Sequence, residues 1–200
     1  QDVTPTDLQH WLDTLRSFLL RVSTVTGRPL VIKSPTHTGR IAALAKEFPD
    51  ARFIHVTRDP RALFPSTCRL WAGLAEAQGM QVARKPSDGS GDENELSADK
   101  QYVVDCLRRM YDAFFRDRET IDSNRIVDIR YEDLVADPVA ILENVYRSLR
   151  LSDFDSVRPV IENWTANEHR AYKTNRHQLS SQDEAVIQTA WKHYFETYGY

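Results

Sequence analysis

Long apolar runs and cysteine clusters are both missing from this sequence. The longest apolar stretch, Phe18–Leu20 with Val22, is far shorter than the roughly 20 residues that span a bilayer, so we expect no transmembrane segment. The two cysteines, Cys68 and Cys106, have no CxxC or Cys/His spacing, which argues against a zinc site or a disulfide framework. The sequence also lacks a cluster of acidic residues suited to a metal ion, so we expect no metal.

Charge of one sign is not concentrated in any run. The 26 basic and 29 acidic residues give a formal charge of −3, and the basic residues are scattered along the chain. This pattern excludes an obvious nucleic-acid-binding surface but leaves open a small anionic ligand held by a few arginines. The chain opens at Gln1 without Met or a signal peptide, so we expect its natural N-terminus to lie upstream and favour a cytoplasmic location for this segment.

The 200 residues, of which 41% are hydrophobic, can build the core of a single domain, 1–200. Apolar periodicity predicts helices, and short β-branched runs predict strands that alternate with them. A strand, helix, strand order is typical of a parallel sheet flanked by helices, that is, an α/β fold. The predicted helices are 7–26, 38–48, 61–78, 100–122, 137–149 and 182–198, the strands are 30–33, 52–57 and 125–129, and the polar segment 79–99 is predicted to be a mobile loop.

Polar side chains follow the carboxyl end of each predicted strand, where open parallel sheets bind their ligands. Lys33 and His37 follow the first strand, Arg58 and Ser66 the second, and Tyr131 the third. An arginine fork and a serine hydroxyl can together hold one phosphate. Taken singly, each position has a simpler interpretation: a solvated loop charge, a helix cap, a structural salt bridge, or a strand running into a helix.

The combination of these segments resembles the sulfotransferases that use 3'-phosphoadenosine-5'-phosphosulfate (PAPS), in particular their bacterial and tyrosylprotein-type branches. The segments KSPTH, FPDARFIHVTRDPRALFPS and RYEDL occur here in that family's order. The match runs from about Pro29 to Leu149, and more loosely to Gly199. Arg-x7-Ser after a strand is its most specific element. The resemblance implies a three-layer, P-loop-like fold and transfer of a sulfuryl group from PAPS to a hydroxyl or amine.

The resemblance also implies roles for individual residues. Arg58 and Ser66 match the site of the donor's 3'-phosphate, and Tyr131 matches a tyrosine near its adenosine. Lys33 matches a lysine at the transferred group and His37 is the candidate general base, although the cytosolic branch has its histidine two residues after the lysine and not four. Further along, the segment 165–180 is either a solvated connector or a loop that helps to hold the 3'-phosphate through Lys173, Asn175 or Arg176.

One element of the family pattern is absent. Family members hold the 5'-phosphosulfate with a loop near the N-terminus, and no such loop precedes Asp7, so we expect the sequence to begin downstream of it. Because the transition state of sulfuryl transfer is loose, the protein contributes mainly by positioning donor and acceptor and by stabilising charge. Sulfate carries less charge than phosphate, which is a second reason to expect no metal.

Two other functions remain open at this point. A P-loop-type kinase would share the layered sheet, but it should place an acidic magnesium ligand where Lys33 stands. A non-catalytic nucleotide-binding scaffold would keep the fold without the chemistry. The acceptor, whether a small molecule, a glycan or a peptide, and the oligomeric state are not encoded in any pattern that we can interpret.

Overall fold

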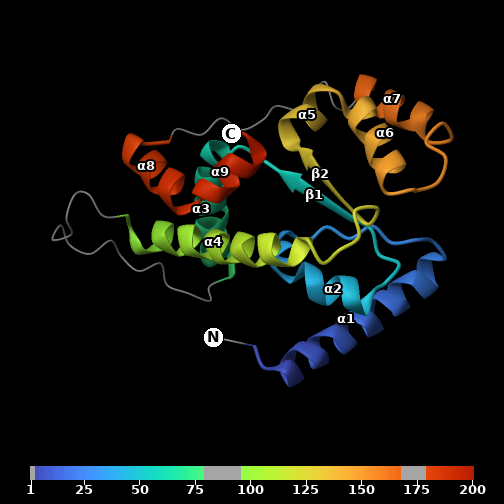
Figure 1. Ribbon diagram of the computed structural model, residues 1–200, viewed down its shortest axis with the longest axis horizontal. Coiled ribbons are helices and arrows are strands. Elements are labelled where there is room, and N and C mark those ends of the chain that lie inside the picture. The colour runs from blue at the N-terminus through green and yellow to red at the C-terminus, as the bar shows by residue number, and fades with distance from the viewer. Residues whose placement is uncertain (1–2, 79–95, 168–178) are drawn as a thin grey trace.

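The computed structural model describes residues 3–78, 96–167 and 179–200. The chain has the predicted α/β architecture, with helices packed around a short parallel sheet (Figure 1). Its elements in chain order are α1 (Pro5–Thr26), the 3-10 helix η1 (Pro35–Arg40), α2 (Ile41–Glu47), β1 (Phe53–Thr57), α3 (Pro60–Gln78), α4 (Ala98–Arg118), β2 (Ile126–Arg130), α5 (Tyr131–Ala136), α6 (Pro138–Ser148), α7 (Arg158–Asn167), α8 (Ser181–Ala190) and α9 (Lys192–Tyr198).

The sheet consists of β1 and β2, which pair in parallel with His55 opposite Asp128 and Thr57 opposite Arg130. Both strands are rich in β-branched and aromatic residues, which suit a pleated surface. Because side chains alternate across a strand, His55 and Thr57 face one side of the sheet, where α4 and α9 cover them. Ile129 faces the other side and packs on α6. Helices therefore lie on both faces, although on the α6 side the β1 residues Ile54 and Val56 stay 46% and 45% exposed.

The predicted strand at 30–33 is wrong. Residues 29–34 have no regular secondary structure, and Val31 and Ile32 are 98% and 50% exposed. A β-branched run becomes a strand only where a neighbouring strand supplies the hydrogen bonds. In the described residues the sheet contains only β1 and β2, so this run stays unpaired.

Local sequence explains where the helices begin and end. The Thr4 side chain accepts a hydrogen bond from the Asp7 amide at 3.1 Å and caps α1. Gly27, with φ of 62°, ends the same helix in the left-handed conformation that glycine favours. Farther along, Gly39 of η1 lies against Met110 of α4, so close that an added Cβ would come within 3.2 Å of the Met110 Cγ. A glycine here allows η1 to lie directly on α4.

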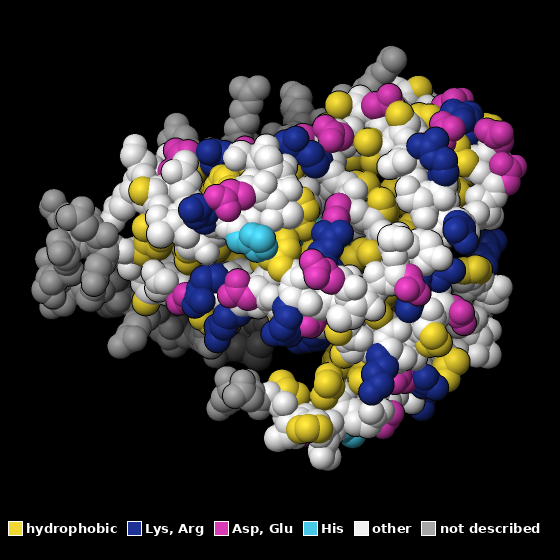
Figure 2. Space-filling model, in the orientation of Figure 1, with side chains coloured by type: hydrophobic (Ala, Val, Ile, Leu, Met, Phe, Trp, Pro, Cys, Tyr) yellow, Lys and Arg dark blue, Asp and Glu magenta, His cyan; other side chains and the backbone are white. Residues whose placement is uncertain are grey.

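The main core lies where α3, α4, α8 and α9 meet. Its largest fully buried side chain is Phe64, and Ile187 is buried with it. On the face shown in Figure 2, acidic and basic side chains are interspersed, with apolar side chains visible between them. No described helix is long and apolar enough to cross a membrane.

Candidate functional site

The carboxyl ends of β1 and β2 lie side by side, and the first residue after each strand is a predicted site residue. Thr57 pairs with Arg130, so Arg58 and Tyr131 emerge together at this edge. The Arg58 Cζ lies 4.6 Å from the centre of the Tyr131 ring, a stacking distance for a guanidinium on an aromatic face. The structure thus brings together two residues that are 73 positions apart, each at a strand end as the sequence predicted.

The acidic side chains beside Arg58 have other partners. Glu132 accepts the Asp59 amide at 3.0 Å and the Tyr200 hydroxyl at 2.9 Å. The Asp59 carboxylate accepts the Arg61 amide at 2.9 Å and lies 3.5 Å from the Arg61 guanidinium. Within the described ranges, no carboxylate forms an ion pair with Arg58. Its guanidinium is therefore oriented by Tyr131 and keeps its charge and donors for an anion.

Ser66 lies on α3, which begins two residues after Arg58. It is half-buried, and its hydroxyl has no hydrogen-bond partner in the part of the chain that the structure describes. The amides of the first turn of α3 are already occupied, because Ala62 and Leu63 donate to the Asp59 carbonyl at 3.0 and 2.9 Å. The first turn of α3 therefore offers a ligand no free backbone amide.

Lys33 and His37 lie on a separate segment, before and within η1. Lys33 is exposed, whereas His37 is half-buried with its ring edge-on to Trp11 at 5.9 Å. The buried His37 Nδ1 has no hydrogen-bond partner in the structure as described. Burial, reinforced by the nearby Arg40, lowers the pKa of His37 below its usual value, so the imidazole is neutral and can accept a proton at neutral pH.

The two halves of the predicted site do not touch. In the described residues, no hydrogen bond, ion pair or ring contact joins Lys33 or His37 to Arg58. The remaining predicted residues, Lys173 and Arg176, lie outside the described residues, as does 79–95 of the predicted mobile loop. The end of that predicted loop is wrong by a small margin, because α4 already begins at Ala98.

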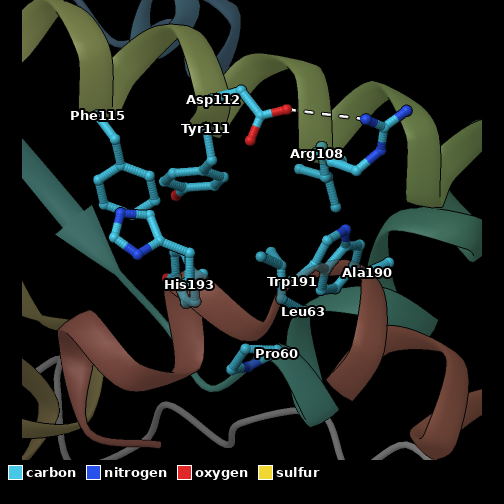
Figure 3. Close-up of a pocket in the computed structure, with 11 residues that line it drawn as sticks. Pro60, Leu63, Arg108, Tyr111, Asp112, Phe115, Ala190, Trp191 and His193 are labelled. Atoms are coloured by element: carbon cyan, nitrogen blue, oxygen red, sulfur yellow. Dashed lines mark ion pairs between the residues drawn. The ribbon is translucent and has the colours of Figure 1, made fainter.

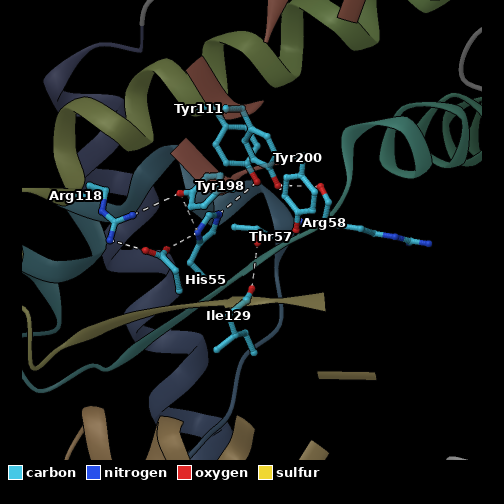
Figure 4. A network of polar contacts seen from close by, with 10 residues as sticks. His55, Thr57, Arg58, Tyr111, Arg118, Ile129, Tyr198 and Tyr200 are labelled. Carbon is cyan, nitrogen blue, oxygen red and sulfur yellow. Dashed lines mark hydrogen bonds and ion pairs between the residues drawn. The ribbon is translucent and has the colours of Figure 1, made fainter. Parts of the chain in front are cut away.

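The sequence interpretation missed the polar network behind the strand ends (Figure 4). His55 Nδ1 lies 2.7 Å from Asp128 Oδ1, and Arg118 forms an ion pair with the other Asp128 oxygen at 2.6 Å. Although burial alone would raise the pKa of the Asp128 carboxyl, hydrogen bonds from His55 and Arg118 hold it below its ordinary value. The signal was a lone histidine inside an apolar strand, FIHVT, opposite an aspartate in IVDIR.

The same interpretation missed two tyrosines near the C-terminus. The Tyr194 hydroxyl contacts the backbone of Arg58, and the Tyr200 hydroxyl contacts Glu132 and Thr57. Both tyrosines lie more than 130 residues after β1, and nothing in the local sequence around them indicates this contact. In Figure 4 the Arg58 side chain extends away from this network, toward the outside of the strand edge.

Two cavities lie elsewhere on the molecule. One of about 30 Å³ is enclosed by α3, α4 and the C-terminal helices, with Tyr111, Phe115 and Trp191 among its walls (Figure 3). The other, of about 390 Å³, is a broad depression beside Arg147 and Arg150. The first is far too small for a nucleotide, since ligand pockets usually measure several hundred Å³, and Arg58 and Tyr131 line neither. The described residues contain no group of three His, Cys, Asp or Glu side chains suited to a metal ion.

Comparison with known proteins decides the family. Residues 4–156 match the model of the sulfotransferase family. The chain belongs to this family. A curated relative, the omega-hydroxy-beta-dihydromenaquinone-9 sulfotransferase Stf3 of Mycobacterium tuberculosis, is 34% identical over 200 residues, which are the whole of this chain and 48% of the relative. This sulfotransferase chain therefore spans about half the length of that curated relative.

More distant sulfotransferases are also similar to the chain. Carbohydrate sulfotransferase 5 of Mus musculus is 23% identical over 147 residues, or 71% of this chain and 35% of that protein. The crystal structure of sulfotransferase STF9 from Mycobacterium avium superposes with a TM-score of 0.62 at 23% identity, covering 83% of this chain and 41% of STF9. At that identity the structural likeness supports the fold.

Proposed function

We propose that this protein transfers a sulfuryl group from PAPS to an acceptor hydroxyl or amine. The observation that carries the proposal is the state of Arg58: at the carboxyl edge of the sheet, stacked on Tyr131, and without an ion-pair partner among the described residues. A fixed guanidinium of this kind suits the 3'-phosphate of the donor. Membership of the sulfotransferase family supports the same conclusion.

In this proposal each residue has a distinct role. Arg58 and Ser66 hold the 3'-phosphate, and Tyr131 lies beside the adenosine. Lys173 and Arg176 remain candidates for the same phosphate. None of these residues needs a metal ion, since the charges that they meet are neutralised by basic side chains.

The chemical step joins the acceptor oxygen to sulfur while the bond from sulfur to the phosphate oxygen breaks. The products are the sulfated acceptor and adenosine 3',5'-bisphosphate (PAP). His37 takes the acceptor proton on its neutral imidazole, and Lys33 stabilises the negative charge that develops on the leaving phosphate. The exposed Lys33 side chain and the low pKa of His37 support these roles.

For the acceptor we propose a small molecule that offers a hydroxyl group. The names of two relatives specify a hydroxylated dihydromenaquinone and a carbohydrate, and both compounds carry hydroxyls. A glycan or a peptide acceptor would use the same chemistry at sulfur.

The decisive experiment is a calorimetric titration of the protein with PAP and with adenosine 5'-monophosphate (AMP). The two ligands differ only in the 3'-phosphate, which is the group that Arg58 and Ser66 are proposed to hold. We expect PAP to bind at least tenfold more tightly than AMP, and to raise the thermal unfolding temperature accordingly. Equal affinity for the two nucleotides, or no binding of either, contradicts the proposed function.

A further inference from the structure

The backbone of Arg58 is held by a side chain from the far end of the sequence. The Tyr194 hydroxyl accepts a hydrogen bond from the Arg58 amide at 3.0 Å and donates one to the Arg58 carbonyl at 3.1 Å. Arg58 is the first residue after the ladder of β1, so these two groups have no partner strand. One buried hydroxyl thus replaces the sheet hydrogen bonds at this position.

A second set of contacts holds the residues on either side. Asp59 donates its amide to Glu132 Oε1 at 3.0 Å, and the other Glu132 oxygen accepts the Tyr200 hydroxyl at 2.9 Å. The Tyr200 hydroxyl also lies 3.1 Å from the Thr57 Oγ1. Three successive residues, 57–59, are therefore held from one side by tyrosines of the C-terminal region and a glutamate of α5.

Tyr194 is well suited to this role. Its side chain is 3% exposed, and burial raises the pKa of its phenol well above the ordinary range. The hydroxyl therefore keeps its proton at every working pH and can always donate to the Arg58 carbonyl. The Tyr194 ring also stacks on the Tyr200 ring, with 6.0 Å between the ring centroids and 8° between the ring planes. The two sets of contacts are therefore packed against each other.

Only the backbone of Arg58 is held in this way, while its guanidinium rests on Tyr131 and stays free for an anion. Because both ends of this long side chain are already fixed, less side-chain conformational entropy is lost when a phosphate binds. We propose that Tyr194 is a positioning residue for the donor site, which fixes the Arg58 backbone so that the guanidinium meets the 3'-phosphate. This inference rests on the proposed function.

The test is Tyr194→Phe, which keeps the ring and removes the hydroxyl. In titrations of the full chain, we expect PAP to bind roughly three- to tenfold more weakly and AMP to bind unchanged, since one net hydrogen bond is lost from the positioning of the phosphate ligand. The dependence of PAP affinity on salt should become shallower. In an Arg58→Ala background, Tyr194→Phe should have no further effect on PAP.

Tyr198→Phe is the matched control. Tyr198 lies on the same helix and its hydroxyl is also part of the polar network, but it contacts Arg118 and His55 rather than residues 57–59. We expect this variant to lower thermal stability while the ratio of PAP to AMP affinity stays unchanged. Should Tyr194→Phe fail to fold, Tyr200→Phe tests the neighbouring contacts that hold residues 57–59 through Glu132 and Thr57. The same selective loss is expected for PAP.

The outcomes separate this inference from the proposed function. If Arg58→Ala weakens PAP binding and folded Tyr194→Phe stays within twofold of the wild type, the positioning role is wrong and the donor site stands. If Tyr194→Phe weakens PAP and AMP equally, or acts equally without Arg58, its role is only structural. If Arg58→Ala leaves PAP affinity unchanged, the proposed function fails and the positioning role fails with it.

Discussion

Among single residues, Arg58 shows how a charge is kept available for a ligand. Asp59 and Glu132 lie next to it in the fold, yet both carboxylates are occupied by backbone amides and other side chains. A free carboxylate in their place would pair with Arg58 and compete with any phosphate. The site therefore depends as much on where the acidic residues are directed as on the arginine itself.

Arg58→Ala should weaken PAP binding by about 1.5–3 kcal/mol, the range for hydrogen bonds to charged groups, and Ser66→Ala should weaken it by less. Titration calorimetry measures both effects. Exposed Arg69 of α3 offers a control, because Arg69→Ala removes the same charge without touching the strand edge. A folded Arg58→Ala protein with wild-type affinity for PAP rules out the phosphate-binding role.

His37 is the second residue whose role can be tested, in a protein that turns over PAPS. Because burial and Arg40 lower its pKa from the ordinary value of 6.5, the low-pH limb of kcat/KM should fall with a midpoint below 6.5. His37→Ala should cost about two to four orders of magnitude in rate and abolish that limb. Exposed His10 of α1 supplies the control variant. A His37→Ala rate within a few-fold of wild type assigns the base to another group.

Among the elements, α6 ends at a residue with a strained backbone conformation, which the sequence does not reveal. Arg150 follows this helix with φ of 50°, in the left-handed region that favours glycine. The Leu151 amide donates to the Tyr146 carbonyl at 2.9 Å and the Arg150 amide to the Arg147 carbonyl at 3.3 Å, the hydrogen bonds of a Schellman motif. The motif is thus made by an arginine at the strained position.

Arg150→Gly should raise the free energy of unfolding by a few tenths to about 1 kcal/mol, because it relieves this strain while adding freedom to the unfolded chain. Urea denaturation at constant m measures the change. Arg147→Gly, inside the same helix, should instead lower the free energy of unfolding by about 1 kcal/mol. A loss of stability in Arg150→Gly would show that its side chain contributes more than its backbone costs.

Prediction from sequence succeeded where local pattern and capping agree, and failed where long-range pairing decides. The helices at 5–26 and 138–148 and the strands at 53–57 and 126–130 match their predicted ranges within a few residues. The strand at 30–33 is wrong because Val31 and Ile32 have the composition of a strand but no partner. The short helices α5 and α7 were missed, since six and ten residues give little periodicity to detect.

The candidate site divides in the same way. Arg58 and Tyr131 were predicted to follow the carboxyl ends of two strands of one parallel sheet, and the structure places them in contact there. The roles of His37 and Ser66 remain predictions. Tyr194 could not be found, because its contact with Arg58 depends on how α9 packs over the sheet, which no local pattern specifies.

For the whole molecule, the network around Asp128 links stability to pH. His55, 6% exposed, and Arg118 hold the Asp128 carboxyl at a lowered pKa between β1, β2, α4 and α9. A carboxyl whose pKa is lower in the folded state contributes stability above its unfolded pKa of about 3.9, and this contribution is lost as pH falls below that value. The network should therefore favour folding at neutral pH and weaken in acid.

Asp128→Asn should lower the free energy of unfolding at pH 7 by about 1–2 kcal/mol, as expected for a partly exposed charge that loses its hydrogen bonds. As pH falls below about 4 the difference from wild type should shrink, because the wild-type carboxyl takes up a proton more readily in the unfolded chain than in the folded one. Urea denaturation between pH 3 and pH 7 measures this. Asp112→Asn, at a side chain that is 64% exposed, should change little at either pH. A constant difference across this range contradicts the linkage.

The contact between Tyr194 and Arg58 can form only late in the synthesis of the protein. The two residues are 136 positions apart, which at about 5–20 residues per second corresponds to roughly 7–27 s of translation. Throughout that interval the nascent chain already carries Arg58 but lacks the hydroxyl that holds it. If Arg58 and Tyr194 act as proposed, a fragment released before α9 would keep the arginine but bind phosphate more weakly, so that full nucleotide recognition would come late in synthesis.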